Sequence, residues 1–243
     1  MIATLKQFIK KTIHIVTTPF ILSDYLNFNK LANKNKLPPL RICDFHPCLF
    51  DKTIKTGFDA HYVYHTSWAA RKVKEINPPK HIDISSSLYF SGIVSAFIPV
   101  DFYDYRPAEL NLSHLKSMRC DLNALPFEDG SVVSLSCMHT VEHIGLGRYG
   151  DTIDPEGDIR AICELKRVVA KYGSLLFVVP VGMPKIEFNA HRIYSFKQIS
   201  EYFSDMTLEE FSLVTDDKNF VENADPSLVE AQKYGCGCFR FTK

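Results

Sequence analysis

Three aspartates stand near the ends of short apolar runs that are typical of β-strands. Asp83 lies in the first run, Asp104 closes the second and Asp121 closes the third, with Asp101 as the alternative to Asp104. An acidic group after a second strand can accept hydrogen bonds from both ribose hydroxyls of an adenosine, and Asp121 can accept one from its exocyclic amine. The three aspartates together predict a nucleoside-binding edge.

A histidine-rich segment follows the fourth apolar run. His139, Glu142 and His143 match the H-x-x-E-H zinc-protease pattern, which requires both histidines on one helical face. Gly145 and Gly147 follow immediately and would end such a helix. We therefore favour an active-site loop over a zinc-protease helix, and predict no metal in this segment.

Two polar loops follow the fourth and fifth apolar runs. Residues 145–151 predict a substrate loop whose arginine points at a phosphate or carboxylate, and residues 189–192 lie where an acceptor would sit. Ordinary solvated turns are the alternative for both. The predicted substrate-binding residues are Arg148, Tyr149, Asp151, Asn189 and Arg192. His143, then His191, is the preferred general base, and Glu142 can also serve.

The seven cysteines indicate reduced thiols in a cytoplasmic protein. Their number is odd, their spacing is scattered and no C-x-x-C pair occurs. Cys43, His46 and Cys48 could be metal ligands, as could Cys236 and Cys238, but each group lacks a matched second half. We therefore expect buried thiols and no metal site in the chain.

Charge and hydropathy exclude some classes of partner. Lys plus Arg and Asp plus Glu number 28 each, so no net charge attracts the chain to nucleic acid or to anionic lipid. The most apolar stretch, 174–183, is shorter than the roughly 20 residues that a bilayer requires, so stable membrane insertion is not expected. One face of a predicted N-terminal helix is apolar and consists of Leu5, Phe8, Ile9 and Ile13. This face predicts packing on the domain or in a homodimer, with peripheral membrane contact as the weaker alternative.

The order of the predicted elements indicates an α/β fold with a doubly wound, mostly parallel sheet. Residues 1–60 are expected to form an N-terminal helical and irregular extension or cap, with a surface loop over 27–39, and 61–243 to form the main domain. The predicted strands are 81–84, 97–103, 118–121, 131–137 and 175–181, followed by an antiparallel edge pair at 208–215 and 238–242. The predicted helices are 62–76, 88–95, 158–171 and 195–203.

Several strings resemble class I S-adenosylmethionine-dependent methyltransferases. The stretch 121–132 resembles their approach to the fourth strand, Glu142-His143 the pair after it, and 164–176 their helix into the fifth strand. The strings at 143–155 and 188–194 are similar to an uncharacterised methyltransferase-like family that has only a domain-of-unknown-function label. The resemblance covers about 62–203 and implies a Rossmann-like fold, S-adenosylmethionine as cofactor and a bacterial surface-polysaccharide or glycan pathway.

The loop after the first strand departs from the methyltransferase pattern. Ser85, Ser86 and Ser87 stand where these enzymes usually have glycine, which permits positive φ and close backbone approach to the cofactor. Serine hydroxyls and N–H groups at a helix start can still hold a carboxylate. The predicted cofactor-binding residues are Asp83, Ser85, Ser86, Ser87, Asp104, Asp121 and His139.

The combined hypothesis is O-methylation of a small polar acceptor such as a sugar or sugar phosphate. In-line methyl transfer depends mainly on positioning, with a base to take the hydroxyl proton. Two alternatives remain open. One is a non-catalytic binding or assembly protein that has lost the cofactor, and the other is a metal-dependent hydrolase that uses His139, Glu142 and His143.

Overall fold

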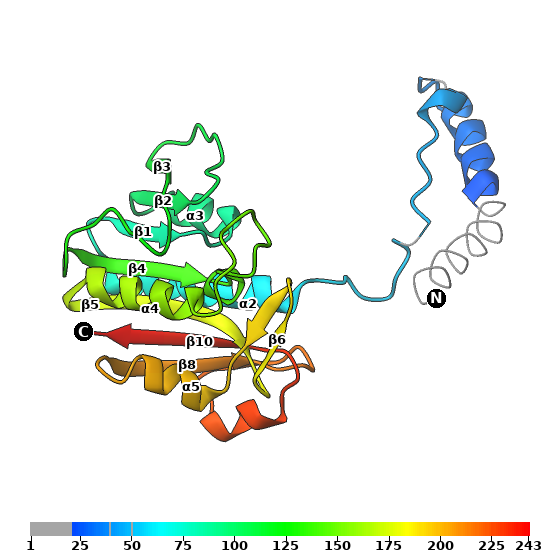
Figure 1. The fold of residues 1–243 in the computed structure, drawn as a ribbon. Coiled ribbons are helices and arrows are strands. Elements are labelled where there is room, and N and C mark those ends of the chain that lie inside the picture. Colours follow the sequence, from blue (N-terminus) through cyan, green and yellow to red (C-terminus); the bar gives the residue numbers. More distant parts are fainter. Residues whose placement is uncertain (1–20, 39, 50) are drawn as a thin grey trace. The chain divides into compact units, whose positions relative to one another are not determined.

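The computed structural model describes residues 21–38, 40–49 and 51–243, in two compact units, 1–57 and 58–243 (Figure 1). In the first unit, residues 21–34 are helical and the 3-10 helix η1 spans Ile42–Asp44. The surface loop predicted over 27–39 was therefore wrong for 27–34, which continue the helix. The apolar face predicted at residues 5–13 lies outside the described residues.

An eight-stranded sheet organises the second unit in the order β3-β2-β1-β4-β5-β10-β8-β9. Strands β3, β2, β1, β4 and β5 are parallel, and β10 is antiparallel to both β5 and β8. The doubly wound, mostly parallel sheet is confirmed. The bounds are β1 His81–Ile84, β2 Val100–Asp104, β3 Leu115–Arg119, β4 Val132–Met138, β5 Val169–Val181, β8 Thr207–Val214, β9 Phe220–Val221 and β10 Gly235–Thr242.

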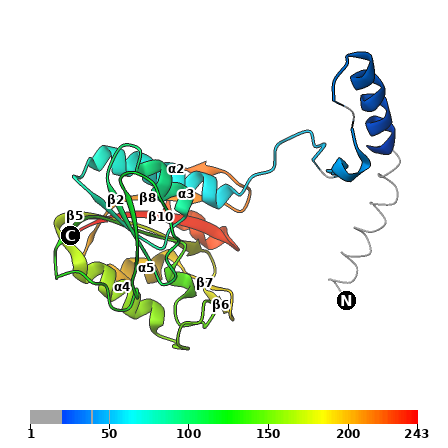
Figure 2. The ribbon, with the colours of Figure 1, turned by 90° about the horizontal axis from the view of Figure 1, so that it is seen from above.

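Helices cover both faces of this sheet (Figure 2). Helices α2 (Ala60–Ile76) and α3 (Leu88–Val94) lie on one face, and α4 (Gly157–Val168) and α5 (Phe196–Tyr202) on the other. The 3-10 helices η2 (Val141–His143) and η3 (Pro226–Ala231) lie in connections. Among the described helices, none has the length and apolarity needed to cross a membrane.

Strand β5 shows how the sequence builds the two cores. Its side chains alternate between faces: Leu175 and Phe177 pack with α4 and α5, whereas Leu176 and Val178 pack with α2 and α3. All four are fully buried. A strand covered on both faces needs the continuous apolar run that the sequence shows here.

The helix ends follow local signals. The side chain of Asp59 accepts a hydrogen bond from Tyr62 N and caps α2, which ends at Asn77 in a left-handed conformation before two prolines. Helix α5 begins with a capping box between Ser195 and Gln198. Both helices were predicted to within two residues.

Three features of the sheet differ from the sequence predictions. Helix α4 ends at Val168, before the predicted end at residue 171, and β5 begins at Val169, with a register shift against β4 between Val132 and Ser134. The late strand pair is not at the edge: β10 lies between β5 and β8. A separate hairpin, β6 (Lys185–Glu187) with β7 (His191–Ile193), was not predicted.

Candidate functional site

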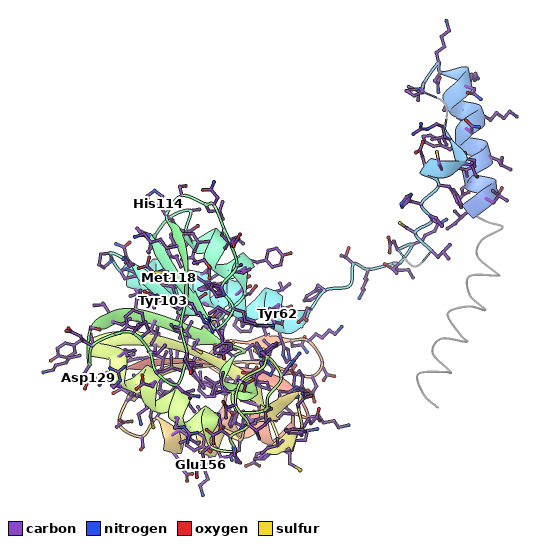
Figure 3. All side chains as sticks on the ribbon, turned by 45° about the horizontal axis from the view of Figure 1, so that its top comes forward. Tyr62, Tyr103, His114, Met118, Asp129 and Glu156 are labelled. Atoms are coloured by element: carbon purple, nitrogen blue, oxygen red, sulfur yellow. The ribbon has the colours of Figure 1, made fainter. Side chains whose placement is uncertain are left out.

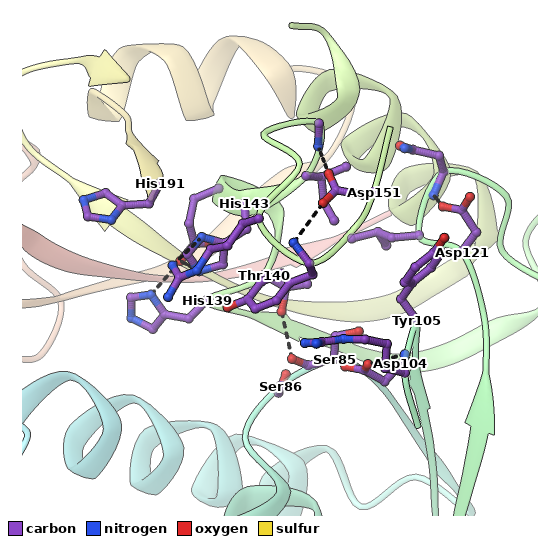
Figure 4. Close-up of a pocket in the computed structure, with 18 of the residues that line it drawn as sticks. Ser85, Ser86, Asp104, Tyr105, Asp121, His139, Thr140, His143, Asp151 and His191 are labelled. Carbon is purple, nitrogen blue, oxygen red and sulfur yellow. Dashed lines mark hydrogen bonds and ion pairs between the residues drawn. The ribbon is translucent and has the colours of Figure 1, made fainter. Parts of the chain in front are cut away.

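A cavity of about 900 Å³ opens at the carboxyl ends of β1, β2 and β4 (Figure 4). It brings together most of the predicted site residues from segments far apart in the sequence. Figure 4 shows the labelled histidines on one side and Asp104, Tyr105 and Asp121 on the other. The predicted residues that line it are Ser85, Ser86, Ser87, Asp104, Asp121, His139, Glu142, His143, Arg148, Tyr149, Asp151 and His191.

Strand register explains this convergence. Ile84, the last residue of β1, pairs with Tyr103 on one side and Cys137 on the other. The residues that follow, Ser85, Asp104 and Met138, therefore meet at one edge of the sheet. Ligands of open α/β sheets bind at this edge, where the strand order reverses between β1 and β4.

The serine loop is held by backbone and hydroxyl contacts. Ser85 has φ of 55°, and its N–H donates to the Tyr103 carbonyl at 2.7 Å. The Ser85 carbonyl accepts from the Thr140 hydroxyl at 2.9 Å, and the Ser86 hydroxyl accepts from Met138 N at 3.1 Å. Ser85 therefore adopts the conformation for which glycine is usual, as the sequence suggested.

Asp83 does not line the cavity, contrary to its predicted cofactor role. Its side chain is fully buried and accepts hydrogen bonds from the hydroxyls of Ser136 (2.5 Å) and Ser91. Ser136 also contacts His81 Nε2 at 2.9 Å. Burial raises the pKa of Asp83 to about 6. This aspartate belongs to a polar network inside the sheet.

The choice between Asp101 and Asp104 is decided by position. Asp101 stands near the start of β2, away from the cavity, and its carboxylate is 2.7 Å from Lys80 Nζ. Asp104 ends the strand and lines the cavity. One oxygen of Asp104 accepts from Arg106 N at 2.7 Å, which fixes the carboxylate at the cavity edge. Asp121 is exposed and accepts from Asn123 N at 2.9 Å.

The histidine segment forms no zinc-protease helix. Between β4 and α4, only the three residues of η2 are helical, so His139 and His143 do not share a helical face. His139 Nδ1 lies 2.9 Å from a carboxylate oxygen of Glu142, whose side chain is buried. Glu142 therefore orients His139, and His139 is the donor in this contact.

The surroundings of His143 favour a proton on Nδ1 over one on Nε2. Nδ1 lies 2.6 Å from the Ala190 carbonyl, which can only accept, and at the longer distance of 3.2 Å from Arg148 Nη1, which can only donate. Burial is the largest influence on its pKa, which is lowered. A neutral imidazole with a free Nε2 suits a proton acceptor.

The loop 145–151 folds around Asp151. One carboxylate oxygen of Asp151 accepts from Gly145 N (2.7 Å) and Gly147 N (3.3 Å), so this predicted substrate residue mainly shapes its own loop. Gly145 has φ of 79°, and a Cβ there would collide with the Asp154 carbonyl. The glycines are thus needed for the loop.

Two arginines approach the Tyr149 ring from different loops. The Arg106 guanidinium lies 4.7 Å from the ring centroid and that of Arg148 lies 5.1 Å from it. Arg148 also donates to the Ala190 carbonyl at 2.9 Å. This part of the cavity wall therefore carries positive charge.

Arg192 and Asn189 do not line the cavity, contrary to their predicted substrate roles. Arg192 is 4% exposed and donates to the Ile144 carbonyl at 2.6 Å. It also donates to the Pro155 carbonyl at 3.2 Å, and its Nε lies 3.4 Å from Asp158. Arg192 holds the two ends of the 145–155 segment. Asn189 is exposed in the β6–β7 connection.

Sequence reasoning missed several cavity residues. Tyr105 and Arg106 directly follow β2, and their position after a strand could have identified them. Tyr62, from α2 (Figure 3), and Tyr234, which precedes β10, could not be found this way, because only tertiary packing brings them to the cavity. Further polar lining residues that were missed are Asn123, Thr152, Asp154 and Arg160.

Comparison with solved structures identifies the fold. The YcgJ protein from Bacillus subtilis superposes with a TM-score of 0.51 at 10% identity, over 74% of this chain and 99% of that one. A candidate sarcosine dimethylglycine methyltransferase from Galdieria sulphuraria gives 0.51 at 9% identity, over 74% and 84%. The [4+2]-cyclase SpnF gives 0.50 at 13%, over 73% and 80%. The chain has the Rossmann-like class I methyltransferase fold.

Comparison of sequences matches only part of the chain to a known family. Residues 129–222, less than half of the chain, match a family model described as "Caenorhabditis protein of unknown function, DUF268". The matched range contains the histidine segment and both polar loops. No curated protein matches the chain.

Proposed function

We propose that the chain binds S-adenosylmethionine and methylates an oxygen of a small polar acceptor. The observation that carries the proposal is the cavity at the carboxyl ends of β1, β2 and β4, with Asp104 at its edge and His143 opposite. The methyltransferase described for Galdieria sulphuraria supports it through a shared fold. A shared fold alone does not establish an activity, since the cyclase SpnF has it too.

The residues at the aspartate side of the cavity suit an adenosine. Asp104 has one carboxylate oxygen beyond its contact with Arg106 N, and it stands where an acidic group meets the ribose hydroxyls. Leu122 and Tyr105 add apolar surface for a purine, and Asp121 and Asn123 add polar groups beside it. The serine loop lies next to Asp104 and would hold the amino-acid part of the cofactor.

The histidine side of the cavity suits the acceptor. When bound, S-adenosylmethionine supplies an activated methyl group. His143 Nε2 would take the proton of the acceptor hydroxyl as the oxygen forms its bond to carbon, and the Ala190 carbonyl would hold the imidazole in place. His191 lines the same region and is the second candidate base.

The charge of the wall favours an anionic acceptor. Arg106 and Arg148 flank Tyr149, and guanidinium groups bind phosphates and carboxylates through paired hydrogen bonds. A sugar phosphate combines a hydroxyl for methylation with such a group. A glycan pathway, which the sequence resemblance implies, would provide substrates of this kind.

The first test is calorimetric titration with S-adenosylhomocysteine, the demethylated product. We expect micromolar binding by the wild type and about 10- to 100-fold weaker binding by Asp104→Asn, because a charge-assisted hydrogen bond to ribose is lost. Asp217→Asn is the matched control, since Asp217 is exposed and is not among the residues that line the cavity. It should bind as the wild type does.

Absence of binding at millimolar ligand would overturn the proposal. The serine side chains at 85–87, where glycine is usual, favour one alternative in that case, a non-catalytic protein that keeps the fold and has lost the cofactor. Equal weakening by both variants would also contradict the placement of the ribose at Asp104.

A further inference from the structure

Three side chains of metal-ligand type meet beside the candidate cavity. His61 comes from the first turn of α2, His139 follows β4 and Cys236 lies on β10. One ligand atom of each lies within 4.8 Å of the other two. Residues 61, 139 and 236 are far apart in the sequence, so no motif reveals the group.

One ligand atom of the cluster lacks a hydrogen-bond partner in the part of the chain that the structure describes. His139 has a side chain that is 5% exposed, and its Nε2 is buried without a hydrogen-bond partner among the described residues. A buried polar atom without a partner is costly and calls for an explanation such as an ion. Cys236 is fully buried next to it.

Neighbouring side chains orient the ligand side chains, as they do at known metal centres. Glu142 accepts from His139 Nδ1 at 2.9 Å, which leaves Nε2 as the ligand atom and increases the electron density on the ring. The His61 ring stacks on the Tyr234 ring, with centroids 5.1 Å apart. Two of the three ligands are therefore oriented by neighbours.

We propose that His61, His139 and Cys236 bind one zinc ion. Two imidazoles and a thiolate are a donor set that zinc accepts readily, whereas magnesium and calcium require oxygen ligands. Binding releases the Cys236 thiol proton to solvent and forms a sulfur–zinc bond. The site shares only His139 with the H-x-x-E-H pattern, and it differs from our expectation of a chain without metal.

The fourth position of the ion is open to a small ligand. His65 Nε2 is buried without a partner, and its ring centroid lies 5.0 Å from that of His139. A water on the zinc would supply the donor that this atom lacks. Three protein ligands plus one water is the arrangement of zinc sites that keep an exchangeable position. The ion would join α2, the end of β4 and β10 at the cavity wall.

Metal analysis of the full chain tests the site. We expect one zinc per chain, and, after exchange for cobalt(II), a near-ultraviolet thiolate-to-cobalt band together with visible bands of tetrahedral cobalt. Cys236→Ser should lose the thiolate band. Replacing the exposed thiols Cys43, Cys48 and Cys163 by serine is the control and should leave the band and the stoichiometry unchanged.

Two further variants keep the test decisive. His61→Gln changes a half-buried residue at a helix start, so it reports on the site even if Cys236→Ser does not fold. Glu142→Gln should lower zinc affinity about 10- to 100-fold, because it removes only the orienting carboxylate. Less than stoichiometric zinc in the wild type, or unchanged zinc affinity in His61→Gln, would overturn the proposal. Binding of S-adenosylhomocysteine is measured separately and does not decide it.

Discussion

Ser85 carries the main departure from the methyltransferase pattern, and its backbone shows why. A φ of 55° is unfavourable for a residue with a Cβ, by about 1–2 kcal/mol. Ser200, which lies inside helix α5, has no such cost. The two serines therefore allow the same substitutions to be compared in opposite conformations.

We predict that Ser85→Gly is more stable than Ser85→Ala by about 1 kcal/mol, because both lack the hydroxyl and only glycine relieves the positive φ. At Ser200 the order should reverse, since glycine in a helix interior is less favourable than alanine by about 1 kcal/mol. Urea unfolding of the four variants measures both differences. The same order at both positions would contradict the conformational explanation.

The buried carboxyl of Asp83 predicts a pH dependence of stability. Its folded pKa is raised to about 6 from 3.8, so between these values the unfolded chain ionises while the folded chain stays protonated. The contribution of Asp83 to the unfolding free energy is therefore at its full value below about pH 4. It decreases by up to about 3 kcal/mol as the pH rises to about 6.

Asp83→Asn should remove this dependence, since an amide does not ionise and can still meet the hydroxyls of Ser91 and Ser136. We expect the stability of Asp83→Asn relative to the wild type to rise between pH 4 and pH 6. Burial lowers the pKa of His81 to about 3 in the same network, and its contribution is common to both proteins. A difference that is constant with pH would show that Asp83 has an ordinary pKa.

Among the elements, the 145–155 segment depends on an anchor outside it. Arg192, on β7, donates to carbonyls at both ends of the segment and pairs with Asp158 on α4. The Tyr194 hydroxyl also donates to Asp158, at 2.9 Å. The predicted substrate loop is thus fixed by the hairpin and by α4, and its arginine and tyrosine are positioned indirectly.

Arg192→Met should lower the unfolding free energy by about 3–5 kcal/mol, because Asp158 would remain buried without its cation. Arg160→Met is the matched control: that arginine is 54% exposed beside Asp154, and its loss should cost less than about 1 kcal/mol. Chemical denaturation measures both, and proteolysis should cut near 145–155 faster only in Arg192→Met. Equal costs would contradict the anchoring role.

At the scale of the whole molecule, the hydrophobic core belongs to the second unit. Among the described residues, both core clusters begin at Ala60 or later and extend to β10. All residues that line the cavity also lie in 58–243. The second unit therefore has what a domain needs to fold alone.

A fragment of residues 58–243 should fold cooperatively, with a midpoint of thermal unfolding within a few degrees of that of the full chain. It should also bind S-adenosylhomocysteine with the affinity of the full chain. Circular dichroism and calorimetry measure the two quantities. A broad, non-cooperative transition would show that residues 1–57 contribute to the core.

Local sequence signals specify the individual elements and the alternation of strands and helices that makes a parallel sheet. The strand 81–84, helix 62–76 and the capped helix at 195–203 are encoded by apolar periodicity, caps and prolines, which act over a few residues. Position after a strand likewise identified Asp104, the serine loop and the histidine segment, because carboxyl ends of parallel strands meet at one edge.

Which side chains face the cavity depends on long-range packing. Asp83 and Arg192 have the right residue types at the right places in the sequence, yet both are buried in polar networks that strand register and the β6–β7 hairpin create. Helix α2 brings Tyr62 to the cavity and His61 to the cluster beside it. Strand β10 brings Cys236 to the same cluster, and the residue before this strand, Tyr234, lines the cavity. Their meeting depends on β10 lying between β5 and β8, a long-range pairing that no local pattern encodes.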